Sequence, residues 1–237
     1  MIITTKRGRN EKIHIYLDGE YSATTTAKAW FSFGISEKQD ISNEEWLSLV
    51  EQIYFNKIYE SSLDLLSRRD HCRREVYDKL YRKYIIERKG ISGSKKEATP
   101  FMNSEECEAL FDKDLILNQI NSVCDRLEEL GLISDERYAR LYAEELVRVK
   151  KMSVPSIKQA LFKRGIPKSI VDDTCDSLDH DSIALIKEIL SSRYRNRDLQ
   201  DESQQSKVIL ALQRKGYTLS EIRQALYEYL EDYISPY

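Results

Sequence analysis

A short segment that recurs at the ends of predicted helices constrains this chain most. Residues 160–165 read Ala-Leu-Phe-Lys-Arg-Gly, residues 211–216 read Ala-Leu-Gln-Arg-Lys-Gly, and residues 79–84 form a degenerate copy. Gly165 and Gly216 fit the left-handed position that ends a helix, and the basic pair before each glycine faces the negative end of the helix dipole. A further helix is expected before and after each copy, so the pattern predicts repeated three-helix units.

The first forty residues follow a different pattern. Residues 13–17 alternate between apolar and polar side chains, and Asp18-Gly19 follows them directly. This combination is a strong signal for a hairpin with a type I′ turn. Residues 20–26 resume the alternation, and residues 1–5 are a candidate third strand. The sequence therefore predicts a small β-hairpin extension at the amino terminus.

From residue 42 onward the apolar spacing changes to about 3.6 residues, the period of a helix. The chain of 237 residues contains only 8 Gly and 4 Pro, whereas an all-β fold needs many turn residues. We therefore predict an all-α fold, a tandem array of three three-helix repeats with the β-hairpin extension. The predicted parts are residues 1–52 (hairpin and linking helix), 53–132 (first repeat, with an insertion at about 86–114), 133–178 (second repeat) and 179–237 (third repeat).

The charge balance excludes a bulk nucleic-acid binder. Lys and Arg number 37 against 40 Asp and Glu, for a formal net charge of -3, whereas such binders carry a strongly positive domain. Contacts with nucleic acid would therefore come from local patches. No segment approaches the roughly 18 consecutive apolar residues of a membrane helix, and residues 1–10 lack the apolar core of a secretory signal. We expect a cytoplasmic protein with no membrane contact.

Residues that could carry catalysis or bind metal do not form known patterns. The sequence lacks phosphate-loop, dinucleotide-binding, nucleophile-elbow and zincin motifs. Its cysteines form no CxxC pair and no cluster with histidine, which argues against a zinc site or a disulfide framework. We expect no enzyme activity, no cofactor and no metal. A hydrolase or nuclease that uses Asp172, Asp173 or Asp181 is the least favoured class, because helix starts attract such carboxylates anyway.

Basic residues gather on the predicted second helix of each unit. If the units stack in register, these residues line one surface that complements phosphates or an acidic protein groove. Charge alone equally allows solvated helix faces with partners for the helix dipole. The candidate contact residues are Arg68, Arg69, Arg73, Arg74, Lys79, Arg82 and Lys83 in the first unit, Lys158, Lys163 and Arg164 in the second, and Arg214 and Lys215 in the third.

Three motifs together resemble the RecX family of bacterial RecA regulators. Residues 65–76, followed by Lys79-Leu80, resemble the opening repeat of that family. Residues 131–139 resemble its most recognisable stretch, and residues 155–166 resemble the segment that follows. The hairpin and the predicted insertion lie outside this shared core.

The resemblance implies a non-enzymatic protein of tandem three-helix repeats that binds along the groove of the RecA–DNA filament. We expect it to be a monomer. Such a protein modulates RecA by inhibiting it, and limits ATPase activity, strand exchange and filament growth in recombination, DNA repair and the SOS response. The basic residues named above are then expected to contact RecA or its DNA. The alternative is a helical DNA-binding protein that acts independently of RecA. Tight, steeply salt-dependent binding to free DNA without RecA would favour that alternative.

Overall fold

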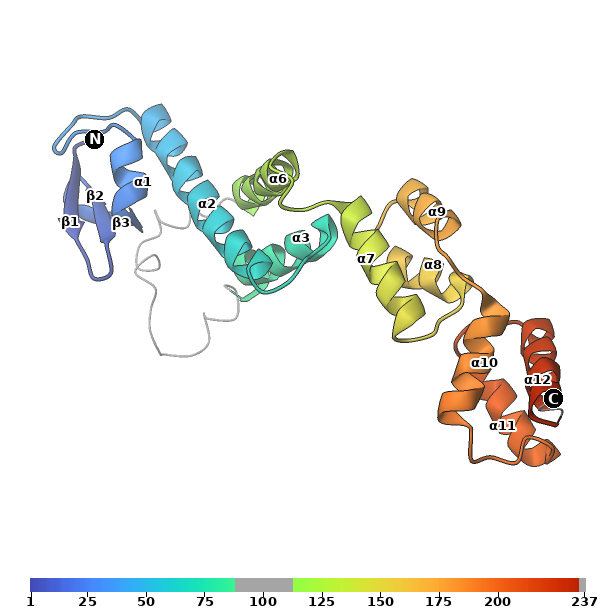
Figure 1. The fold of residues 1–237 in the computed structure, drawn as a ribbon. Coiled ribbons are helices and arrows are strands. Elements are labelled where there is room, and N and C mark those ends of the chain that lie inside the picture. Colours follow the sequence, from blue (N-terminus) through green and yellow to red (C-terminus); the bar gives the residue numbers. More distant parts are fainter. Residues whose placement is uncertain (88–112, 235–237) are drawn as a thin grey trace. The chain divides into compact units, whose positions relative to one another are not determined.

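The structure, a computed structural model, describes residues 1–87 and 113–234 (Figure 1). The insertion predicted at about 86–114 falls almost entirely outside these described residues. The chain divides into two compact units, an amino-terminal unit over Met1–Ile133 and a carboxy-terminal unit over Ser134–Tyr237. Within the described ranges, none of the helices combines the length and the apolarity needed to cross a membrane.

A three-stranded antiparallel sheet begins the amino-terminal unit. Its strands β1 (Ile3–Arg7), β2 (Lys12–Leu17) and β3 (Glu20–Thr26) lie side by side in that order. Asp18 and Gly19 have φ values of 49° and 89°, as a type I′ turn requires. The predicted hairpin is confirmed, and the candidate third strand is present as β1.

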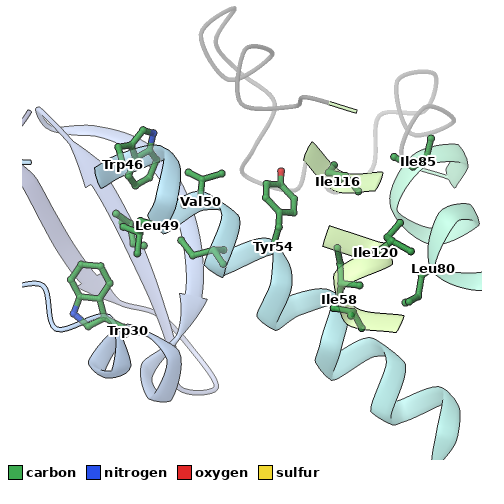
Figure 2. Close-up of a cluster of buried hydrophobic side chains, with 14 of the residues drawn as sticks. Trp30, Trp46, Leu49, Val50, Tyr54, Ile58, Leu80, Ile85, Ile116 and Ile120 are labelled. Atoms are coloured by element: carbon green, nitrogen blue, oxygen red, sulfur yellow. The ribbon is translucent and has the colours of Figure 1, made fainter. Parts of the chain in front are cut away.

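The inner face of the sheet packs on two helices, α1 (Ala27–Ser32) and α2 (Asn43–Leu66). Ile3, Ile13 and Ile15 belong to the same buried cluster as Trp30 and Trp46, and the two tryptophans lie beside the sheet in Figure 2. The side chain of Ser42 accepts a hydrogen bond from the backbone N–H of Glu45, whose carboxylate accepts one from the N–H of Ser42. This reciprocal capping fixes where α2 begins.

Three helical segments complete the amino-terminal unit. The helix α3 (Arg73–Tyr81) continues as a π-helix, η1 (Arg82–Ile86), and α6 (Lys113–Glu129) packs against both. Leu80 and Ile85 point toward Ile116 and Ile120 of α6, with Ile58 of α2 beside them (Figure 2). Val76 and Leu80 form the face that α3 buries.

The carboxy-terminal unit consists of two helix triplets. The first contains α7 (Asp135–Arg148), α8 (Val154–Lys163) and α9 (Lys168–Asp176), and the second contains α10 (Ser182–Arg193), α11 (Glu202–Gln213) and α12 (Leu219–Ile234). Gly165 and Gly216 have φ values of 77° and 90°, so both end their helices in the left-handed conformation as predicted. Thr218 and Glu221 form a second capping box before α12.

The loop between α7 and α8 is held by the second triplet and the segment before it. The Tyr217 hydroxyl donates to the Lys151 carbonyl at 3.1 Å, and His180 Nε2 lies 3.0 Å from the Met152 carbonyl. The backbone N–H of Ser153 donates to the Lys215 carbonyl at 3.1 Å. These contacts fix the two triplets to each other within the unit. The predicted all-α fold with an amino-terminal β extension is confirmed.

Candidate functional site

The basic residues of the amino-terminal unit surround the turn between α2 and α3, but Arg73 is occupied by contacts within the fold. Its guanidinium donates to Asp125 Oδ1 at 2.6 Å and to Glu128 Oε2 at 2.5 Å, both on α6. Burial lowers the pKa of Arg73, but the hydrogen bond to Asp125 and the charge of Glu128 outweigh it, so the net direction is upward. Arg73 therefore joins α3 to α6.

Arg68 and Arg74 make exposed ion pairs with acids four residues away in the chain. Arg68 Nη2 lies 2.8 Å from Asp64 Oδ2, and Arg74 Nε lies 3.7 Å from Asp78 Oδ2. Exposed pairs at this spacing contribute only about 0.3–0.5 kcal/mol. A negatively charged partner could therefore replace these carboxylates at little cost.

A buried histidine organises the turn itself. His71 Nδ1 lies 2.8 Å from the Arg69 carbonyl, and Nε2 lies 2.7 Å from Lys79 Nζ. An ammonium only donates, so Nε2 accepts from Lys79 and Nδ1–H donates to the carbonyl. Burial is the main cause that lowers the pKa of His71. Arg69 and Lys79 are thus tied to a neutral imidazole, and Arg69 also pairs with Glu75 at 3.0 Å.

The last two candidates in this unit lie on η1. Lys83 Nζ donates to Ser61 Oγ at 2.8 Å and lies 5.5 Å from the centre of the Tyr84 ring. Arg82 is exposed at the start of η1. Within residues 1–87 and 113–234, no carboxylate pairs with either side chain.

In the carboxy-terminal unit, three of the candidate residues hold helices together. Lys158 Nζ lies 2.9 Å from Asp172 Oδ1, and this hydrogen bond raises the pKa of Lys158. Arg164 donates to the Tyr138 hydroxyl at 2.6 Å, and its guanidinium lies 4.7 Å from the centre of a second tyrosine ring. Lys215 donates to the Lys150 carbonyl, and burial lowers its pKa.

Lys163 and Arg214 are exposed at the ends of α8 and α11. Neither has a carboxylate partner in the described part of the chain. Arg82 directly follows α3. If α2, α3 and α6 are taken as a third triplet, Arg82, Lys163 and Arg214 occupy matching positions at the end of the second helix of each triplet. Sequence could not separate them from the occupied cations, because the partners of Arg73 lie more than fifty residues away.

The acids considered for catalysis do not gather in one place. Asp172 pairs with Lys158, Asp181 caps α10 through the N–H of Ala184, and Asp173 is exposed on α9. Among the residues with described positions, no group of His, Cys, Asp and Glu could hold a metal ion.

The sequence did not indicate one further surface, the outer face of the amino-terminal sheet, because its residues are not clustered along the chain. The outer face of the sheet presents Lys6, Lys12, Tyr16 and Tyr21, which come from three different strands. The alternation of residues 12–17 was the signal that could have found it, since it places every second side chain on one face.

Comparisons with known proteins agree with the fold. Residues 134–174 match the family model described as RecX, second three-helix domain. A protein named Regulatory protein RecX from Caldanaerobacter subterraneus is 26% identical over 231 residues, 95% of this chain and 98% of the relative. A protein of the same name from Clostridium tetani is 23% identical and aligns over 94% of this chain and 91% of its own length.

The crystal structure of a regulatory protein RecX is 22% identical in sequence, and the superposition covers 97% of each chain with a TM-score of 0.58. This match supports the same arrangement of helices and sheet. The sequence relatives, the family model and the shared fold confirm that this chain resembles the RecX family of regulatory proteins along nearly its whole length.

Proposed function

We propose that this chain regulates the RecA recombinase by inhibiting it, and that it binds along the groove of the RecA–DNA filament. The observation that carries the proposal is the resemblance to proteins named Regulatory protein RecX over 95% of the chain. Binding limits ATPase activity, strand exchange and filament growth without any catalytic step of its own. Such a regulator acts in the cytoplasm, as a monomer, during recombination, DNA repair and the SOS response.

The helix triplets α2–α3–α6, α7–α9 and α10–α12 are, in this proposal, three repeats that meet successive subunits of the filament. Each repeat needs only a weak contact, because contacts made by linked modules add through effective concentration. A chain with a net charge of -3 then binds the filament through a few specific contacts. Its net charge does not favour non-specific binding to DNA.

The structure divides the candidate residues by what they already bind. We assign direct contact to Arg82, Lys163 and Arg214, which are exposed at the end of the second helix of each triplet. Supporting contacts are assigned to Lys83, which follows Arg82, and to Arg68, Arg69 and Arg74, which lie at the other end of α3. Arg73, Lys79, Lys158, Arg164 and Lys215 act indirectly, because each is bound within the fold.

A charge-reversal pair of variants tests the assignment. The test variant carries Arg82→Glu, Lys163→Glu and Arg214→Glu. The control carries Arg126→Glu, Lys168→Glu and Arg223→Glu, which make the same change of charge on the third helix of each triplet. Both are titrated into RecA strand-exchange and ATPase reactions, and folding is checked by circular dichroism.

The test variant is expected to need at least about ten-fold more protein for half-inhibition, which corresponds to about 1.4 kcal/mol of lost binding. The control is expected to stay close to the wild type. Equal losses in the two variants would refute the contact assignment, and no effect of the wild type on RecA would refute the proposed function. Inhibition well below one protein per RecA subunit would indicate capping of filament ends, whereas a stoichiometric effect would indicate occupation of the groove.

A further inference from the structure

The outer face of the amino-terminal sheet gathers two lysines, two tyrosines, a histidine and three threonines. Successive side chains of a strand point to opposite faces, so the burial of Ile13 and Ile15 turns their neighbours outward. Across strands, Lys6 lies opposite His14, Tyr16 opposite Tyr21, and His14 opposite Thr24. The outward positions of the three strands are Thr4, Lys6, Lys12, His14, Tyr16, Tyr21, Thr24 and Thr26. No outward position in these strands carries an acid.

The aromatic rings on this face are held in place. The Tyr16 and Tyr21 ring centres are 5.7 Å apart in an edge-to-face arrangement, and the His14 ring lies 6.0 Å from Tyr21. His14 Nδ1 and the Tyr21 hydroxyl each lie 2.7 Å from Thr24 Oγ1. A Cβ on Gly8 would come within 2.4 Å of His14 Nε2, so glycine is needed there for the imidazole to keep its position. The rings form a fixed, half-exposed platform.

Cations lie around this platform. Lys6 Nζ is 4.8 Å from the centre of the Tyr16 ring, and Lys12 is exposed on the same face. In the described portion of the chain, neither lysine is paired with a carboxylate. Lys6 Nζ lies over the face of the Tyr16 ring. When the ammonium leaves this face to bind a phosphate, the face becomes free to stack on the attached base.

The platform continues into a cavity of about 560 Å³. Lys12, His14 and Tyr21 line it from the sheet, and Lys57 and Lys83 line it from α2 and η1. This volume lies in the range of small-molecule sites, roughly 300–1,000 Å³, and suffices for one nucleotide unit.

The cavity also has two acids on its α2 wall, Glu60 and Asp64, and Asp64 is already paired with Arg68. The phosphate backbone of a nucleic acid bound at this cavity is therefore expected along the sheet side, which carries lysines and no acids.

We propose that this sheet face binds single-stranded nucleic acid, with bases stacked on Tyr16 and Tyr21 and phosphates at Lys6 and Lys12. A single strand fits better than a duplex, because stacking needs bases whose faces are exposed. It fits better than an acidic peptide, because a peptide of carboxylates would leave the ring faces unused. The proposal concerns a surface apart from the basic helix ends and does not depend on regulation of RecA.

The test uses the full chain without RecA and measures fluorescence anisotropy of a labelled fifteen-nucleotide oligo-dT. The variants are Lys6→Glu alone, Lys6→Glu with Lys12→Glu, and Tyr16→Leu with Tyr21→Leu. The matched control is Arg7→Glu, which changes the charge by the same amount as Lys6→Glu on the adjacent position of β1 but on the opposite face. Tyr16→Phe with Tyr21→Phe keeps the rings and controls for the loss of the hydroxyls.

We expect the leucine variant to bind at least about five-fold more weakly, which is the lower end for one lost stacked base. The lysine variant is expected to bind more weakly and to show a shallower dependence of log Kd on log salt, by about 0.7 for each lost phosphate contact. Arg7→Glu should stay within about two-fold of the wild type, because its side chain lies on the opposite face of the sheet. The phenylalanine variant loses the hydrogen bond between Tyr21 and Thr24 but keeps both rings, so it should lose less binding than the leucine variant.

Three results would overturn the proposal. The first is a duplex of equal length that binds as tightly as the single strand. The second is an equal effect of Arg7→Glu and Lys6→Glu, which would indicate diffuse attraction. The third is competition by polyglutamate that matches competition by unlabelled oligo-dT at equal charge. Thymidine monophosphate added as a competitor distinguishes a site for a nucleic-acid strand from a site for free nucleotides. Displacement of oligo-dT by micromolar thymidine monophosphate would indicate a site for free nucleotides and would also contradict the proposal.

The lysines are exposed, so the lysine variants still test the binding of phosphates if the leucine variant unfolds.

Discussion

Replacing Gly216 with alanine tests how the carboxy-terminal unit is held together. Gly216 ends α11 with a φ of 90°, and a Cβ added there would lie 2.0 Å from Ser156 Oγ and 2.3 Å from Ser153 Oγ. The two hydroxyls can rotate away, but Ser156 Cβ, at 3.1 Å, cannot. The substitution therefore disturbs the contact between the start of α8 and the end of α11.

Two costs contribute to the expected loss of stability. A residue with a Cβ in the left-handed conformation costs roughly 1–2 kcal/mol, and overpacking of a close contact costs about 1–3 kcal/mol. Alanine also reduces the entropy of the unfolded chain, which returns about 0.4–1 kcal/mol. We expect a net loss of about 2–4 kcal/mol.

Gly131→Ala is the matched control. Gly131 also has a positive φ, 65°, but a Cβ there meets nothing within 4 Å. It should lose only about 1 kcal/mol, the cost of the backbone conformation alone. The difference between the two variants measures the steric cost at Gly216.

Urea unfolding followed by two probes assigns each loss to a unit. Both tryptophans, Trp30 and Trp46, lie in the amino-terminal unit, so their fluorescence reports that unit alone, whereas far-ultraviolet circular dichroism reports both. Gly216→Ala should lower a circular dichroism midpoint by about 1 M urea and leave the fluorescence midpoint unchanged. If Gly216→Ala cost no more than Gly131→Ala, the close contact with Ser156 would not exist as described.

Three further variants or probes test the amino-terminal unit. Arg73→Met should destabilise the amino-terminal unit by about 1–2 kcal/mol, because two carboxylates, Asp125 and Glu128, lose their partner. Tryptophan fluorescence during urea unfolding measures this loss of stability. A loss no larger than that of Arg126→Met would contradict the prediction. The pKa of His71 is lowered in the folded protein, so below about pH 6.5 the unfolded chain binds more protons than the folded protein does. The free energy of unfolding should therefore decrease as the pH falls. The variant His71→Gln should lack this decrease between pH 7.5 and 5. Burial raises the pKa of Cys124 to about 11, so its alkylation by iodoacetamide at pH 8 should be slow until urea unfolds the unit. Peptide mass spectrometry measures the extent of alkylation. Fast labelling of the native protein would contradict this prediction, because it would show that the thiol is accessible.

Local signals in the sequence predicted the local features of this fold. Asp18-Gly19 predicted the hairpin, and Gly165 and Gly216 predicted two helix ends, because each of these conformations is decided by the residue that adopts it. The apolar spacing of about 3.6 residues after residue 42 predicted helices, and Val76 and Leu80 are buried at that spacing on α3. These predictions needed no knowledge of distant contacts.

Features set by distant partners could not be predicted in this way. Nothing near Arg73 indicates that its charge is bound by two residues of α6. The bulge at Ser22, which shifts the register between Ile15 and Tyr16, is likewise invisible in the alternation. The candidate site was therefore predicted as a set of cations, and only their partners in the folded chain separate exposed cations from occupied ones.

The loop between α7 and α8 has a consequence for the modularity of the chain. The carbonyls of Lys150, Lys151 and Met152 are bound by Lys215, Tyr217 and His180, none of which belongs to the α7–α9 triplet. A fragment that stops after α9 would leave these acceptors to solvent and lose the contacts that shape the loop. The two triplets have similar sequence motifs, but the loop of the first is bound by residues outside it. A chimaera that exchanges one triplet with that of a relative would therefore have to transfer the loop together with its three donors.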